Sequence, residues 1–268
     1  MKGRGRVVLW LSGQAKRKMV TLGLMAALIL FVFTNQLPAD KTWTYWTLPL
    51  SGKVFVIDPG HGGPDGGAES RTGLMEKDVT LSIALHLRDY LQQAGAIVYM
   101  TRDEDKDLAR PETKGFSRRK TEDLKARVQL LQESDADAFI SVHLNAIASS
   151  RWSGPQTFYT HNHADNPALA WFIQEELRQN VVETHRQAKP IHGIYVMTHA
   201  KMPAALVEVG FLSNEAEAAK LGDPTYQMKL AAAIYRGVLR YVSGEQAPNG
   251  PAGNAGQTEQ PKEQGESA

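Results

Sequence analysis

The chain of 268 residues contains no cysteine. This absence excludes disulfide bonds, thiolate metal ligands and a cysteine nucleophile, so the fold must be stable through its hydrophobic core alone. The chain also lacks an excess of either charge, since its formal net charge is +1. Such a balance provides no overall attraction to the phosphates of nucleic acids, and we expect no nucleic-acid partner.

Large apolar side chains are missing from residues 244–268, where small and polar residues dominate. A segment of this composition cannot bury enough apolar surface to offset the entropy lost on ordering, so we predict a disordered tail. The sequence shows no internal repeat. We therefore expect one folded domain over residues 53–243, preceded by a linker over 38–52.

The N-terminus consists of a basic segment followed by an apolar one. Residues 1–18 carry lysine and arginine without any acidic residue, and residues 19–37 carry no charge. A helix rises about 1.5 Å per residue, so the apolar segment is just long enough for a bilayer core of roughly 30 Å. We predict a transmembrane anchor or signal segment over 19–37, a cytoplasmic segment over 1–18 and export of the rest. The weak cleavage signal before Asp40, with Leu37 at the third position from the cut, favours a retained anchor.

Between residues 53 and 243, short apolar runs alternate with amphipathic segments. The apolar runs predict strands at 53–58, 96–101, 138–143, 156–160, 194–197 and 204–209. The amphipathic segments predict helices at 76–94, 123–133, 166–182 and 224–242. This alternation predicts an α/β fold, in which a single domain has a mostly parallel or mixed central sheet flanked by helices on both faces.

Three candidate functional residues stand at the ends of predicted strands. His61 follows the first strand, His143 ends the third, and Glu208 lies near the end of the last. Ligands of such sheets gather at the carboxyl ends of the strands, so we expect these side chains to meet at one edge. Glu76 starts a predicted helix, where its negative charge also suits the positive end of the helix dipole. Because it occurs together with His61 and His143, we include it as a fourth candidate functional residue.

His61 lies in a glycine-rich stretch, residues 58–63, with the sequence DPGHGG. Glycines allow unusual backbone dihedral angles and a close approach of the backbone to a ligand. The alternative is a phosphate-binding loop, but the pattern G-x-G-x-x-G is absent and such a loop has no use for a central histidine. We therefore interpret His61 as a metal ligand.

His143 and Glu208 interrupt apolar strands. A lone histidine in a strand is often a hydrogen-bonded core residue, but Asn145 would share the face of His143 and form a polar pocket wall. Glu208 is costly to bury unless it is paired or near a metal, and burial would raise its basicity as a general base requires. We interpret His143 as a metal ligand, Glu208 as a catalytic carboxylate and Asn145 as a substrate contact.

Two histidines and a glutamate match the three protein ligands of a catalytic zinc ion, and a second glutamate can accept a proton from the attacking water. The pattern predicts a Zn2+-dependent hydrolase. Arg102 and Arg127 are candidates to orient carboxylates or to contact an acidic substrate.

Four motifs resemble those of the zinc-dependent N-acetylmuramoyl-L-alanine amidases of bacterial cell walls; they are DPGHGG at 58–63, LMEKD at 74–78, SVHLNA at 141–146 and VEVGFLSN at 207–214. The resemblance covers about residues 53–243, which would form the catalytic domain. It implies a zinc ion held by His61, Glu76 and His143, with Glu208 as the catalytic carboxylate. It also implies peptidoglycan as the substrate, cleaved at the amide between the lactyl group of N-acetylmuramic acid and L-alanine.

Within this family, the stretches 56–67, 74–80 and 100–107 are most similar to the germination-specific members of spore-forming bacteria. This resemblance implies a role in spore cortex maturation and germination, through muramic-lactam formation. It also implies a catalytic domain outside the cytoplasm, in the space between the forespore membranes. The autoinhibitory helix frequent in the family is not evident in the short insert over 106–121, so the sequence does not identify an accessory or activator protein.

Three other functions remain open at this point. A glycosidase would use Glu76 and Glu208 as paired carboxylates, but it would leave both histidines unexplained. A non-catalytic wall-binding module would have no use for a hydrolytic carboxylate. Another zinc-dependent wall hydrolase, a carboxypeptidase or a deacetylase, would release D-alanine or acetate instead of exposing the amino group of L-alanine.

Overall fold

The computed structural model describes residues 12–34 and 48–248. Most of the predicted linker and most of the predicted disordered tail lie outside these residues. The chain divides into two compact units that adjoin in sequence at Leu48 and Pro49.

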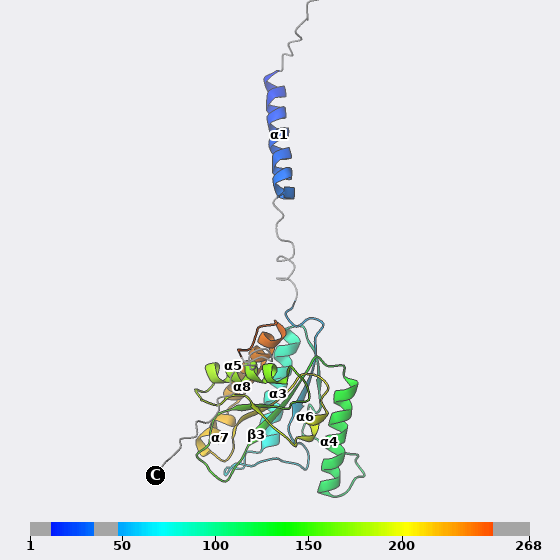
Figure 1. Cartoon of the computed structure of the whole chain (residues 1–268), viewed down its shortest axis with the longest axis vertical. Coiled ribbons are helices and arrows are strands. Elements are labelled where there is room, and N and C mark those ends of the chain that lie inside the picture. The colour runs from blue at the N-terminus through cyan, green and yellow to red at the C-terminus, as the bar shows by residue number, and fades with distance from the viewer. Residues whose placement is uncertain (1–11, 35–47, 249–268) are drawn as a thin grey trace, which may run out of the picture. The chain divides into compact units, whose positions relative to one another are not determined.

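The described part of the first unit contains helix α1 (Gly13–Thr34) (Figure 1). Among the described residues, no helix is long and apolar enough to cross a membrane. The predicted transmembrane or signal segment over 19–37 extends past the described residues at 35–37 and stays a prediction.

The second unit is built around a six-stranded sheet with the strand order β2-β1-β3-β6-β4-β5. Its strands are β1 (Val54–Pro59), β2 (Ile97–Met100), β3 (Ala138–Asn145), β4 (Gln156–Tyr159), β5 (Lys189–Pro190) and β6 (Ala204–Phe211). Strands β2, β1, β3 and β6 are parallel to one another, whereas β4 is antiparallel to β6. The mixed sheet confirms the predicted fold class.

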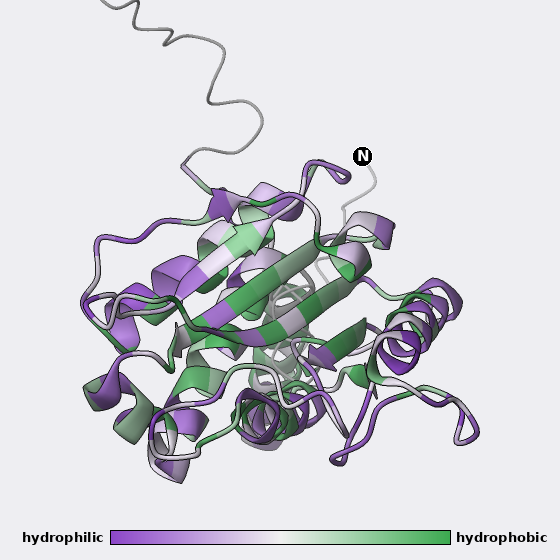
Figure 2. Cartoon of the chain, turned by 90° about the horizontal axis from the view of Figure 1, so that it is seen from below, coloured by the Kyte–Doolittle hydropathy of each residue, from purple (hydrophilic) through white to green (hydrophobic). Residues whose placement is uncertain are grey.

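Helices cover both faces of this sheet (Figure 1). One face packs against α3 (Glu76–Gln93), α5 (Asn166–Asn180) and α8 (Pro224–Val242). The other face packs against α4 (Phe116–Glu133) and α6 (Tyr195–His199). The short helix α7 (Glu215–Leu221) follows β6 and contacts α8. In Figure 2 the central strands are mostly green, whereas the surrounding helices carry many purple residues, as expected for a buried sheet with solvated helices.

Local sequence explains where α8 begins and how closely it packs. The side chain of Asp223 accepts a hydrogen bond of 2.7 Å from the backbone N–H of Thr225, and Pro224 occupies the first turn. Farther along, Gly237 allows α8 to approach α5, because a Cβ at this position would lie 2.5 Å from Cα of Ile173. The two helices therefore meet almost backbone to backbone.

Residues 194–197, predicted as a strand, belong instead to the start of α6. A short apolar run fits either a strand or one helical turn, and here Val196 and Met197 are buried by the helical turn against the face shared with α4. Helix α4 also begins at Phe116, earlier than the predicted residue 123. Strand β5 and helix α7 were not predicted, since each is too short for a periodic signal.

The alternation of side chains along the strands decides which face carries the candidate site. Residues two apart point to the same face, so His143 shares the face of Phe139, and Glu208 shares that of Leu206. This is the face covered by α4 and α6. His143 and Glu208 are neighbours in the β3–β6 register, and Glu208 pairs in turn with Gln156 of β4. A polar row therefore crosses three adjacent strands.

Candidate metal centre

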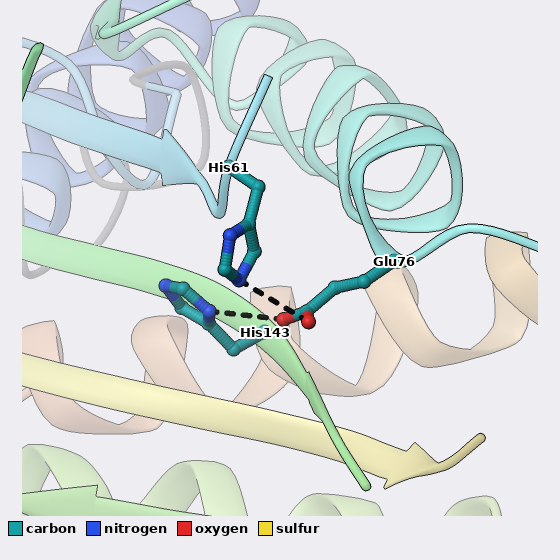
Figure 3. Close-up of side chains that lie close together, drawn as sticks. All are labelled: His61, Glu76 and His143. Atoms are coloured by element: carbon teal, nitrogen blue, oxygen red, sulfur yellow. Dashed lines mark hydrogen bonds and ion pairs between the residues drawn. The ribbon is translucent and has the colours of Figure 1, made fainter. Parts of the chain in front are cut away.

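Three of the predicted site residues converge at the carboxyl edge of the sheet (Figure 3). His61 comes from the loop after β1, Glu76 is the first residue of α3, and His143 lies in β3. Nε2 of His61 is 3.2 Å from Oε2 of Glu76, and Nδ1 of His143 is 3.0 Å from Oε1 of the same carboxylate. One possible ligand atom from each residue lies within 4.8 Å of the other two.

The donor set fits a zinc ion, because two imidazole nitrogens and one carboxylate oxygen are a common ligand set of catalytic zinc. Two glycines also leave room for these three side chains, because glycine has no Cβ atom. A Cβ at Gly60 would lie 2.5 Å from the ring of His143, and one at Gly67 would lie 2.6 Å from Glu76 and from His61. Larger residues at these two positions would displace the three side chains.

Glu76 is kept ionised although it is buried. Burial by itself would raise its pKa, but hydrogen bonds from His143 and His61 more than offset this and hold the pKa well below the usual range. Its two oxygens also accept backbone N–H groups, from Leu144 at 2.9 Å and from Ala68 at 2.9 Å. A carboxylate held in its charged form is ready to bind a cation.

Glu208 has the opposite electrostatic setting. Burial raises its pKa to about 7, with His143 and His61 opposing the rise and Glu76 adding to it. Its Oε2 atom is buried and has no hydrogen-bond partner among the described residues. A carboxylate with a near-neutral pKa and an unpartnered oxygen can both accept and donate a proton.

Two buried arginines hold the loop that carries His61, whose backbone has a φ of 63°, uncommon for a residue other than glycine. Arg127 donates hydrogen bonds to the carbonyl oxygens of Pro59 at 2.9 Å and His61 at 2.6 Å. Arg102 donates to the carbonyl oxygens of Pro59 at 3.1 Å and Gly60 at 2.8 Å. These four bonds fix the backbone on both sides of the strained residue.

The position of Arg102 does not support the predicted contact with substrate. Its side chain is only 1% exposed, and it also donates to the carbonyl oxygens of Lys77 and Glu104. Arg102 therefore joins the His61 loop to the start of α3. Asn145 is partly exposed at the end of β3, where its carbonyl oxygen accepts the N–H of Leu212, and its contact with substrate stays a prediction.

The acidic partners of Arg127 were missed by sequence analysis. Its guanidinium lies 2.6 Å from Oδ1 of Asp58 and 2.9 Å from Oδ2 of Asp123. Burial would raise the pKa of Asp58, but Arg127 and hydrogen bonds from Thr101 and Ser141 lower it to about 2. One signal was present in the sequence, because a carboxylate within a buried strand needs a partner.

Asp65 was also missed. Its Oδ2 atom lies 2.9 Å from Nδ1 of His61 and 2.7 Å from Nζ of Lys120. Burial would raise the pKa of Asp65, but hydrogen bonds from Lys120 and His61 lower it to about 2. Metal-binding histidines often have such a carboxylate at the second ring nitrogen, which fixes the ring and leaves the first nitrogen for the ion. In His61 this leaves Nε2, the atom that faces Glu76.

A cleft of about 240 Å³ opens beside the centre on the α4 side. Its lining includes both histidines, Lys120 of α4 and the segment 193–196. The cleft gives a ligand access to His61 and His143 from the face of the sheet that α4 and α6 cover only in part.

Comparison with known proteins identifies relatives over most of the second unit. Residues 55–240 match the family described as N-acetylmuramoyl-L-alanine amidase. The chain is 53% identical over 233 residues to the germination-specific N-acetylmuramoyl-L-alanine amidase of Bacillus subtilis (strain 168), a match that covers 87% of this chain and 98% of the relative.

Two solved structures are similar as well. One is the CwlD amidase from Clostridioides difficile in complex with the GerS lipoprotein, with 40% identity and a TM-score of 0.70 over 72% of this chain and 100% of that chain. The other is an N-acetylmuramoyl-L-alanine amidase from Clostridium difficile 630, with 32% identity and a TM-score of 0.63 over 72% of this chain and 98% of that one.

Proposed function

The chain belongs to the N-acetylmuramoyl-L-alanine amidase family and is a peptidoglycan hydrolase, and we propose that it works with a zinc ion held by His61, Glu76 and His143. The bond cleaved is the amide between the lactyl group of N-acetylmuramic acid and L-alanine of the stem peptide. The observation that carries this proposal is the convergence of three possible ligands from separate elements beside Glu208, whose buried Oε2 has no partner among the described residues.

Glu208 is proposed as the general base and acid. A bound zinc ion supplies Lewis acidity and lowers the pKa of water to about 7. Glu208 takes a proton from the water that attacks the amide carbonyl, and it returns that proton to the departing amine of L-alanine. A pKa of about 7 suits both transfers near neutral pH. Asp65 and Arg127 keep His61 in place while this happens.

The biological setting is proposed from the relatives. The relative in Bacillus subtilis is named germination-specific. We extend this to spore cortex peptidoglycan, where cleavage exposes the lactyl carboxyl group that muramic lactam formation needs, and to a catalytic domain outside the cytoplasm. The similar amidase from Clostridioides difficile was solved in complex with a lipoprotein, which supports an accessory protein for this chain too.

Product analysis tests the reaction. Purified protein is incubated with peptidoglycan, with and without a strong chelator, and the products are analysed by mass spectrometry. We expect new stem peptides with a free N-terminal L-alanine, lost on chelation and restored by zinc. Release of D-alanine or acetate, or sugar cleavage that survives the chelator, would contradict the proposal.

The roles of the two kinds of site residue can be separated by substitution. Glu208→Gln should keep zinc binding but lose hydrolysis by about 10²-fold or more, because the proton acceptor is removed. His61→Ala should lose both. Bound metal is measured by elemental analysis and hydrolysis by release of N-terminal L-alanine. A Glu208→Gln variant that cleaves peptidoglycan at near the wild-type rate would remove Glu208 from the mechanism.

A further inference from the structure

An exposed aromatic ring lies on a loop that crosses the edge of the candidate site. Residues 146–155 connect β3 to β4, and β6 lies between these two strands in the sheet. The loop therefore passes over the carboxyl end of β6, the strand that carries Glu208. The indole of Trp152 on this loop is 52% exposed, although tryptophan is a large apolar side chain.

The ring of Trp152 is held in place even though it is exposed. The guanidinium carbon of Arg186 lies 5.4 Å from the centre of the Trp152 ring and 4.8 Å from that of Phe211. Arg186 also donates to the carbonyl oxygen of Ser153 at 3.0 Å and to Oε1 of Gln156 at 2.7 Å. One guanidinium covers one face of an indole, so ring surface is left open to solvent.

The loop itself is anchored beyond the end of β6. The side chain of Asn214 donates to the carbonyl oxygen of Ser150 at 2.9 Å. Buried Glu217 accepts the N–H groups of Gly154 at 2.8 Å and Phe211 at 2.9 Å. A rigid aromatic ring loses little entropy when it binds a partner, which is why such rings are effective contact residues.

Strand register places Trp152 near the reacting groups. Gln156 is the register partner of Glu208, and Trp152 precedes Gln156 by four residues. Four residues span at most roughly 14 Å, so the backbone of Trp152 lies no farther than that from Gln156, the residue beside Glu208. Sugar units next to a muramic acid bound at the site would reach it.

We propose that Trp152 is a stacking platform for a pyranose ring of the glycan strand to which the stem peptide is attached. This inference deepens the proposed function and rests on it for the identity of the substrate. The C–H groups on a pyranose face carry partial positive charge and pack well on the negative face of an indole. The loop also carries Ser149, Ser150 and Ser153, whose hydroxyl groups can exchange hydrogen bonds with sugar hydroxyls, and Ile147 is the other exposed large apolar side chain on it.

Substrates of different length test the platform. Trp152→Ala should raise KM for polymeric peptidoglycan about five- to tenfold, the effect of one lost aromatic stacking contact, with kcat within about twofold of wild type. On a muramoyl peptide with a single sugar, the variant should match the wild type. Trp152→Tyr keeps an aromatic face and should restore most of the lost affinity. Tyr99→Ala is a matched control, because Tyr99 is 47% exposed but lies on β2 at the far edge of the sheet.

Binding of peptide-free glycan strands, measured by co-sedimentation, gives a readout without catalysis. The wild type should bind and Trp152→Ala should not. If Trp152→Ala and the wild type have equal KM values and bind glycan strands equally, the inference is overturned. It is also overturned if the only property that Trp152→Ala loses is co-purification with a lipoprotein partner. A wild type that releases no N-terminal L-alanine from either substrate would refute the amidase function instead, and glycan binding would still decide the role of Trp152.

Discussion

At the scale of single residues, the site depends on how neighbouring groups set the proton affinity of two buried carboxylates. Glu76 lies between two imidazoles, and their hydrogen bonds keep its pKa low in spite of burial. Glu208 is buried without such a partner, so its pKa rises to about 7. The same side chain therefore suits cation binding at one position and proton transfer at the other.

The raised pKa of Glu208 predicts a pH-dependent cost in stability. Its folded-state pKa of about 7 lies above the ordinary value of 4.5, so the folded protein binds this proton more tightly than the unfolded chain does. Stability should then fall as the pH rises from 4.5 to 7, by up to about 3 kcal/mol. In the metal-free protein, Glu208→Gln should be more stable than the wild type at pH 8 and similar to it at pH 4.

Urea unfolding at the two pH values measures this difference. Glu183→Gln, at an exposed loop position, is the control and should change neither value. The wild-type kcat/KM should rise through the same pH range, because the base works in its deprotonated form. The same stability difference at pH 4 and pH 8 would show that Glu208 titrates as an ordinary glutamate.

Asp65 should act on the metal through His61. Asp65→Asn removes the charge next to Nδ1 of His61 and weakens the contact with Lys120, so the ring is less well oriented. We expect zinc affinity to fall about 10- to 100-fold, as measured by competition with a chelating dye. Asp103→Asn removes an exposed carboxylate that contacts Lys106 and should leave zinc affinity unchanged. Equal affinities in the two variants would show that Asp65 does not support the ligand.

At the scale of secondary-structure elements, each part of the site is delivered by a different connection. The loop after β1 provides His61, the start of α3 provides Glu76, and the ends of β3 and β6 provide His143 and Glu208. Arg102 and Arg127 connect these elements by donating hydrogen bonds to backbone carbonyl oxygens. The geometry of the site therefore depends on how closely the helices pack on the sheet.

The contact between α5 and α8 offers a test of this packing. In Gly237→Ala the new Cβ would lie 2.5 Å from backbone of Ile173, which cannot move independently of α5. The helix propensity of alanine offsets part of the clash, and we expect a net loss of about 1–2 kcal/mol in the free energy of unfolding. Gly222→Ala is the control, because its nearest neighbouring atom would be 3.6 Å away. Denaturant unfolding compares the two, and equal stability would show that α5 and α8 are not in tight contact.

At the scale of the whole molecule, a metal ion would connect parts of the chain that are far apart in sequence. His61 and His143 are separated by more than a third of the second unit, and no such arrangement exists in the unfolded chain. A ligand that binds only the folded state stabilises it, by about 4 kcal/mol at a thousandfold excess over Kd. Metal binding should therefore be visible in thermal unfolding.

Removal of zinc should lower the melting temperature by roughly 10 °C, since a domain of this size shifts by about 2–4 °C per kcal/mol. Calorimetry with and without chelator measures the shift, and added zinc should reverse it. The His61→Ala variant should show no shift with chelator. If neither chelator nor added zinc changes the melting temperature of the wild type, a bound ion at this centre is contradicted.

Sequence patterns predicted most elements of the second unit but failed where the signal was short. The buried strand β1 has a continuous apolar run bounded by polar residues and the amphipathic helix α8 has a long periodic signal, and both formed within a residue or two of the predicted range. The run 194–197 has too few residues to distinguish a strand from a helical turn, and tertiary packing made it helical. For the N-terminal segment, hydropathy indicated a membrane span over 19–37, and this stays a prediction because residues 35–37 lie outside the described part of the chain.

The sequence by itself determined that His61, His143 and Glu208 would share one edge, because the carboxyl ends of neighbouring parallel strands lie together. Only the tertiary structure decided which buried groups hold them there. The pairing of Arg127 with Asp58 and the contact of Lys120 with Asp65 both join segments that are far apart in sequence. Such contacts leave no local periodicity in the sequence, since they arise when the sheet order and the helix packing bring separate segments together.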